Sequence, residues 1–103
     1  MMKLFIVTCL KEYQADVLKI FNKAQITVFS MADVTGFKNG RAEDVLDDWF
    51  ASGDERFDSQ VLFSFTSGKN AGEALELVSM YNKENETAFP LRAFIVPVEK
   101  SNL

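Results

Sequence analysis

Carboxylates are the side chains of this sequence that could do chemistry, and they are concentrated in one stretch. Residues 40–60 read GRAEDVLDDWFASGDERFDSQ, and seven of the 15 acidic residues lie between positions 43 and 58, with Arg56 as the one basic residue among them. Carboxylate oxygens bind Ca²⁺ or Mg²⁺, and a pair of carboxylates can act as general acid and base. The stretch therefore raises two hypotheses, a divalent-cation site and an acid–base site.

The spacing of these acids favours neither hypothesis. The stretch does not match the ligand spacing of an EF-hand loop. Asp47 and Asp48 are adjacent, so their side chains diverge on any regular element. The chain has no histidine, which removes the usual base at neutral pH and the commonest metal ligand. We therefore expect a solvated charge cluster and predict no catalytic residue, no metal ligand and no cofactor.

Composition limits the remaining classes of function. The single cysteine, Cys9, excludes an internal disulfide and favours a reducing compartment. It has no histidine partner and ends an apolar run, which indicates a buried, inert thiol. A net charge of −4 gives no basic footprint for nucleic acid, and no stretch has the roughly 20 apolar residues of a membrane span. These features predict a cytoplasmic protein that is not membrane-embedded.

Hydrophobic periodicity predicts the elements that must position these residues. Apolar or alternating runs indicate four strands, at residues 3–10, 26–37, 59–67 and 89–99. A helical period follows the first and third runs, with the second helix opening at Ser67-Gly68 and Asn70 as its predicted N-cap. The order β-α-β-loop-β-α-β is typical of the α+β ferredoxin-like sandwich, a four-stranded antiparallel sheet with two helices on one face.

Two helices can cover only one face of such a sheet, yet both faces are apolar. The first strand offers Phe5, Val7 and Cys9 on one face against Leu4 and Ile6 on the other. The last strand offers Leu91, Ala93 and Ile95 against Phe94, Val96 and Val98. An apolar patch of this size is larger than soluble monomers usually expose. The pattern predicts a homo-oligomer that buries the second face between copies.

Several of these segments resemble the PII (nitrogen regulatory protein P-II) signalling proteins. Their second strand typically ends in V-x-G-F, as at Val34, Gly36 and Phe37, and AFIVPVE (93–99) is similar to their closing strand. The likeness covers nearly the whole chain in element order. It implies one PII-like domain over residues 1–103, a non-catalytic regulatory role, and a homotrimer whose sheets face inward.

The resemblance also implies two binding regions. Residues 38–58 would be the counterpart of the T-loop, the arm that docks onto a protein partner, with a membrane transporter as one candidate. The expected partner contacts are Asp47, Asp48, Trp49 and Phe50. The residues expected to bind a small effector between subunits are Gly36, Phe37, Lys38, Asn39 and Arg92. Where PII proteins carry a glycine-rich phosphate loop, this chain has NKENETAFPLR (82–92), with no glycine and two acids.

Three alternatives stay open. Val45, Leu46, Trp49 and Phe50 have helical spacing, so the loop could fold back onto the body. The divalent-cation tolerance trimers of the same superfamily resemble the chain in Thr8-Cys9 and in a tryptophan before the third strand, which would make the acidic loop a metal binder. A small dimeric ferredoxin-like enzyme would need a polar cavity on the open sheet face. Phe5, Val7, Phe63 and Phe65 argue against such a cavity.

Overall fold

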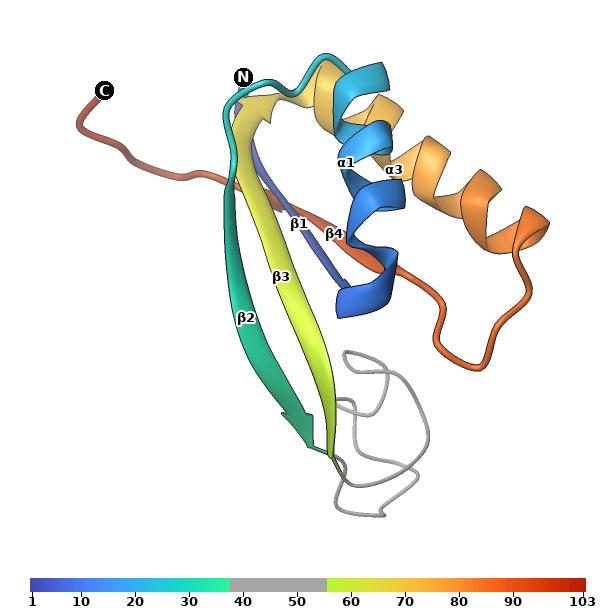
Figure 1. Ribbon diagram of the computed structural model, residues 1–103. Helices are drawn as coiled ribbons and strands as arrows, with labels where there is room; N and C mark the ends of the chain where they lie inside the picture. Colours follow the sequence, from blue (N-terminus) through green and yellow to red (C-terminus); the bar gives the residue numbers. More distant parts are fainter. Residues whose placement is uncertain (38–55) are drawn as a thin grey trace, which may run out of the picture.

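The structure, a computed structural model, describes residues 1–37 and 56–103. Its strands are β1 (Met2–Leu10), β2 (Ser30–Phe37), β3 (Arg56–Ser67) and β4 (Arg92–Pro97). They form one antiparallel sheet in the order β2-β3-β1-β4. A short 3₁₀ turn (Lys11–Tyr13) leads into α1 (Gln14–Lys23), and α3 (Gly68–Glu84) follows β3. Both helices cover the same face of the sheet (Figure 1), so the predicted ferredoxin-like sandwich is confirmed.

The core lies between the two helices and the sheet. Phe5 stands opposite Ser64 and Ile95 in the register, and Val7 stands opposite Leu62 and Ala93. Phe5 and Val7 are fully buried, and the Phe21 ring of α1 packs on Phe5 with centroids 5.7 Å apart. Phe5 and Val7 therefore face the helices. The prediction that Phe5 and Val7 argue against a polar cavity on the open sheet face was therefore wrong. β-strand alternation puts both residues on the opposite side of the sheet from Phe63 and Phe65.

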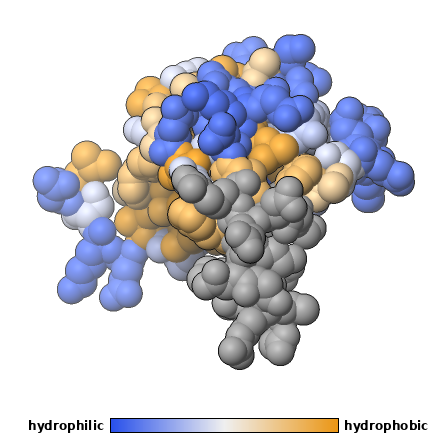
Figure 2. Space-filling view, turned by 60° about the horizontal axis from the view of Figure 1, so that its bottom comes forward, coloured by the Kyte–Doolittle hydropathy of each residue, from blue (hydrophilic) through white to orange (hydrophobic). Residues whose placement is uncertain are grey.

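The other side of the sheet, which we call the outer sheet face, is apolar. In the register Ile6 stands between Phe63 and Phe94, and Leu4 stands between Phe65 and Val96. Phe65 is 55% exposed, Phe94 42% and Val96 41%. Figure 2 shows hydrophobic side chains gathered together beneath a hydrophilic upper surface. The apolar side chains on this face include Leu4, Ile6, Val61, Phe63, Phe65, Phe94 and Val96.

Three strands begin three or more residues away from their predicted starts. Residues 26–29 are not in β2, because Gln25, two residues after α1, adopts the left-handed region (φ 61°) and the Ile26 N–H donates to the Phe21 carbonyl at 2.9 Å. Ile26 is then buried as part of the helix end. β4 begins at Arg92, not at 89, because the Asn82 side chain binds both backbone groups of Leu91. β3 extends to Arg56 because β2 pairs with it as far as Phe37.

The start of α3 is also capped differently from the prediction. The N-cap is Ser67, whose hydroxyl accepts a hydrogen bond from the backbone N–H of Asn70 at 3.1 Å. Asn70 therefore lies inside the first turn, and its predicted role as N-cap was wrong. Neither α1 nor α3, the two α-helices in the part of the chain that the structure describes, is long and apolar enough to cross a membrane.

Candidate functional site

The predicted effector residues fall on opposite edges of the sheet. Gly36 and Phe37 end β2, where Gly36 is buried opposite Phe57 and the Phe37 side chain is 60% exposed. Arg92 begins β4 opposite Thr8 and is half-buried. Two strands separate the edges, a distance of about 14 Å at the usual spacing. One subunit therefore does not bring Gly36 and Phe37 together with Arg92.

The other predicted site residues lie outside the described part of the chain. These are Lys38 and Asn39 of the effector set, and Asp47, Asp48, Trp49 and Phe50 of the partner set. The segment that carries them leaves the sheet at Phe37 and returns at Arg56, which are paired residues of β2 and β3. Both ends of the segment therefore lie at the same end of one hairpin, as expected for an insertion between the second and third strands.

Sequence reasoning missed a cavity of about 330 Å³ beside that hairpin, which we call the Phe57–Phe89 cavity. It lies where β1 ends, β3 begins and the chain approaches β4. The two phenylalanine rings meet edge to face, with centroids 5.9 Å apart. The lining residues are Leu10, Lys11, Glu12, Phe57, Asp58 and Phe89.

A sequence signal for this cavity existed. Lys11 and Glu12 directly follow the first predicted strand, and Phe57 and Asp58 directly precede the third. The antiparallel pairing of Leu10 with Ser59 brings these two strand ends together. Phe89 had been predicted to lie inside the last strand. It lies instead in the connection before β4, which leaves its ring at the end of the sheet.

The charge of the Phe57–Phe89 cavity is dominated by carboxylates. The ammonium group of Lys11 lies 3.2 Å from Asp33 Oδ2, a residue that does not line the cavity. Gln60 Nε2 donates to Asp33 Oδ1 at 2.7 Å. These two hydrogen bonds and the nearby charge of Lys11 lower the pKa of the Asp33 carboxyl. Because Lys11 is paired with Asp33, the carboxylates of Glu12 and Asp58 make the described lining of the cavity negative.

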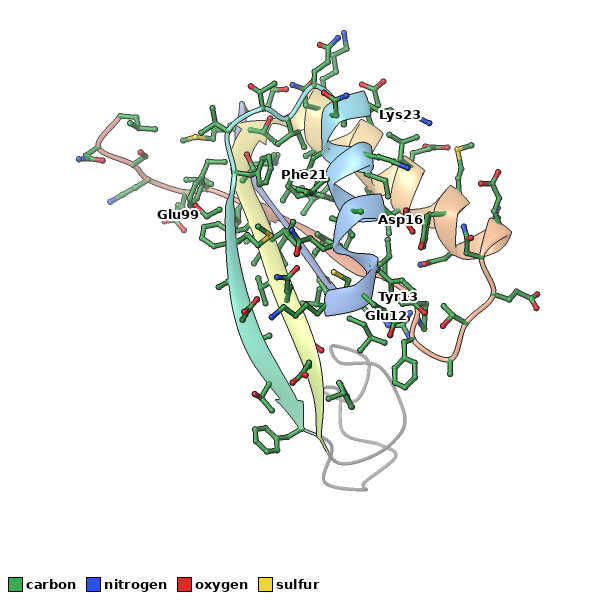
Figure 3. The ribbon with its side chains drawn as sticks, in the orientation of Figure 1. Glu12, Tyr13, Asp16, Phe21, Lys23 and Glu99 are labelled. Atoms are coloured by element: carbon green, nitrogen blue, oxygen red, sulfur yellow. The ribbon has the colours of Figure 1, made fainter. Side chains whose placement is uncertain are left out.

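Tyrosine hydroxyls hold the surrounding elements in place. Tyr13 and Thr87 share a hydrogen bond of 3.0 Å, which ties the start of α1 to the connection that carries Phe89. Figure 3 shows Glu12 and Tyr13 together at the end of α1 that is nearest this connection. The Tyr81 hydroxyl donates to Asp16 Oδ2 at 2.6 Å. Burial, followed by the bond to Asp16, raises the pKa of Tyr81 to about 12, so this hydroxyl keeps its proton at neutral pH.

Arg92 lines a second, shallower cavity of about 480 Å³, between α3 and β4. Most of its walls are apolar, and they include Leu75, Val78 and Phe94. The double hydrogen bond of Asn82 to Leu91 fixes the backbone directly before Arg92. Arg92 is thus a cation at the edge of a mostly apolar groove.

The Cys9 thiol is buried against the helices, as predicted. Burial raises its pKa to about 11, so the thiol is un-ionised at neutral pH. A thiol, unlike a thiolate, is neither a strong nucleophile nor a metal ligand. Cys9 is a core residue.

Comparison with known proteins identifies the fold. No family model and no curated protein matches the sequence. Among solved structures, a DUF3240 family protein from Shewanella baltica is 13% identical with a TM-score of 0.66, and the match covers 99% of this chain and 94% of that one. A PII-like signalling protein from Thermus thermophilus is 12% identical, with a TM-score of 0.60 over 91% of this chain and 83% of that one.

A third solved structure was determined with ligands. CPII, a nitrogen regulatory PII-like protein from Thiomonas intermedia, is bound to ADP, AMP and bicarbonate. It is 7% identical to this chain, with a TM-score of 0.62 over 97% of this chain and 94% of that one. At such identities the likeness is one of backbone architecture. The chain has the ferredoxin-like fold of the PII-like signalling proteins.

Proposed function

We propose that this chain is a non-catalytic PII-like regulatory protein that works as a cytoplasmic homotrimer. It binds a small effector between subunits. It relays that binding through residues 38–58 to a protein partner, for which a membrane transporter is one candidate. The observation that carries the proposal is the outer sheet face, which in a protein of this fold is apolar where a monomer should be polar.

The outer sheet face supports association with copies of the same chain. Burying a large apolar side chain contributes about 1.5–3 kcal/mol, and this face carries seven such side chains. Head-to-tail contacts between copies can close a ring around a threefold axis and bury such a face at its centre. The resemblance to PII proteins, whose trimers turn their sheets inward, favours three copies.

The position of the effector residues supports a site between subunits. Gly36 and Phe37 lie on one edge of the sheet and Arg92 lies on the other, so a single copy does not bring them together. In a ring of copies, opposite edges of neighbouring sheets can meet. An effector held by Gly36, Phe37, Lys38 and Asn39 of one subunit and Arg92 of the next would then require the oligomer.

The fluorescence of the chain's single tryptophan, Trp49, tests the relay directly. We expect a saturable change in Trp49 emission with at least one of AMP, ADP and bicarbonate, the ligands of CPII. Arg92→Gln should weaken that response about tenfold, since a charge-assisted hydrogen bond contributes roughly 1.5–3 kcal/mol. Lys69→Gln, which removes an exposed cation at the start of α3, is the matched control and should leave it unchanged. If none of these probes changes the emission, the sensor proposal is wrong.

The divalent-cation alternative makes a different prediction. Within the described residues, 1–37 and 56–103, no group of three or more potential metal-ligating side chains comes together. A metal site would therefore have to involve the acidic loop. Calorimetry with Cu²⁺, Zn²⁺, Mg²⁺ and Ca²⁺ should then give heat with the wild type and none with a variant lacking Asp47, Asp48 and Asp54. Such a result would favour metal binding over the regulatory proposal.

A further inference from the structure

We propose that the Phe57–Phe89 cavity binds a small organic cation of the alkylammonium class. Its lining residues differ from the effector set of Gly36, Phe37, Lys38, Asn39 and Arg92, although Phe57 pairs with Gly36 in the sheet register. It lies within one subunit and does not depend on the trimer. The proposal therefore goes beyond the regulatory function and can fail or succeed independently of it.

The cavity combines the two kinds of group that recognise ammonium ions. Phe57 and Phe89 are half-buried and meet edge to face at 5.9 Å, so part of each ring borders the cavity. The negative face of an aromatic ring attracts a cation, by about 0.5–1 kcal/mol at exposed sites and about 2 kcal/mol where water is excluded. Leu10 adds an apolar wall for the alkyl part of the ligand.

The charges of the lining disfavour an anion. Glu12 and Asp58 both line the cavity, and Lys11, the one cation among the described lining residues, is paired with Asp33 at 3.2 Å. A phosphate or carboxylate entering the cavity would meet two like charges. A cation would gain the attraction of both carboxylates in a cavity that two aromatic rings also line. The site is thus complementary to a ligand of opposite sign to AMP, ADP and bicarbonate.

The lining also separates an organic cation from a metal ion. A Ca²⁺ or Mg²⁺ site needs about six oxygen ligands, whereas the acidic residues among the described lining supply two carboxylates beside two hydrocarbon rings. Aromatic rings do not replace the water shell of a divalent ion, but they do suit a weakly hydrated alkylammonium group. The volume of about 330 Å³ matches the lower end of the range for small-ligand pockets.

Choline and its neutral isostere 3,3-dimethyl-1-butanol test the proposal on the wild-type chain. The two molecules have the same shape and differ in charge. We expect choline to shift the NMR signals of the Phe57 and Phe89 rings in a saturable way. The neutral isostere should bind at least about tenfold more weakly, a difference equivalent to about 1.4 kcal/mol.

Single substitutions then locate the site. Glu12→Gln and Asp58→Asn change exposed residues, so both variants should fold, and each should weaken choline binding about fivefold to tenfold. Glu73→Gln, an exposed acid on α3 away from the cavity lining, is the matched control and should bind choline like the wild type. AMP and inorganic phosphate should not compete with choline.

Three results would overturn the proposal. The first is the absence of choline binding at concentrations of about tens of millimolar, beyond which an affinity has no recognition value. The second is equal binding of choline and its isostere, which would make the cavity merely apolar. The third is choline binding that Glu12→Gln and Asp58→Asn leave unchanged, which would put the ligand elsewhere. None of these results bears on Trp49 emission or on the oligomeric state.

Discussion

At the scale of single residues, Gln25 has an unusual backbone conformation for a residue with a side chain, because its φ is positive. It follows α1 by two residues at φ 61°, and the Ile26 N–H bonds back to the Phe21 carbonyl. Glycine adopts this left-handed conformation without the clash that a Cβ causes. We expect Gln25→Gly to raise the free energy of unfolding by about 1 kcal/mol. Urea denaturation measures it, with Gln25→Ala as the control, which keeps a Cβ and should change little.

The Asp33 carboxyl provides a pH-dependent prediction. Hydrogen bonds from Gln60 and Lys11 and the charge of Lys11 lower its pKa in the folded state. The stabilisation is therefore present above the unfolded-state pKa of about 3.9 and is lost as the pH falls through the lower, folded-state value. Lys11→Met should raise the Asp33 midpoint in a carbon-detected NMR titration. Lys19→Met removes an exposed cation of α1 and should leave the Asp33 midpoint unchanged. If Lys11→Met also leaves the Asp33 midpoint unchanged, Lys11 is not a cause of the lowered pKa.

Individual residues show what the sequence could and could not predict. Burial of Cys9 followed from its place in an apolar strand without polar partners, and the structure confirms it. The positions of Gly36 and Phe37 at a strand end were also predictable, whereas Arg92 was predicted inside the last strand and begins it instead. The sequence indicated only part of the Phe57–Phe89 cavity, where the ends of the first and third strands come together. The meeting of Phe89 with these ends depends on the connection before β4 and on the Tyr13–Thr87 hydrogen bond. Local pattern carries no information on such a meeting.

At the scale of elements, the start of α3 tests which residue caps the helix. Ser67 accepts a hydrogen bond from the Asn70 N–H, so Ser67→Ala should lower the free energy of unfolding by about 1 kcal/mol. Asn70→Ala leaves that backbone bond intact and should have a smaller effect. Ser79→Ala is a second control, since the Ser79 hydroxyl donates to the Leu75 carbonyl inside the helix and does not cap the start of α3. Thermal denaturation of the three variants compares them directly, and a larger loss for Asn70→Ala would restore the original prediction.

Element type was easier to predict than element ends. The four strands and two helices follow from periodicity, because each element must bury one face on the common core. Their ends depend on contacts made elsewhere. Ile26 is apolar and β-branched, which suits a strand, yet it is buried as part of the end of α1. Phe89 and Leu91 suit a strand equally well, but the hydrogen bonds of Asn82 hold Leu91 outside β4.

At the scale of the whole molecule, the two faces of the sheet have different partners. The face with Phe5 and Val7 is covered by α1 and α3 within the chain. The outer sheet face has comparable apolar side chains, but its covering must come from another copy if the proposed trimer is right. The sequence predicted that both faces are apolar. The number of copies does not follow from that pattern, because an apolar face can be buried equally in a dimer or in a trimer.

A charge on the outer sheet face should separate the copies. Phe65 is 55% exposed in one subunit, so Phe65→Glu costs the single chain little. In an oligomer the same carboxylate would be buried without a partner, which costs several kcal/mol. We therefore expect the wild type to sediment at about 35 kDa, three times the 11.6 kDa of one chain, and Phe65→Glu to sediment as a single chain. Met80→Glu introduces the same charge at a 49% exposed apolar residue of α3 and should leave the trimer intact. A wild type that sediments as one subunit, or a Phe65→Glu variant that stays trimeric, would show that the outer sheet face is not the interface.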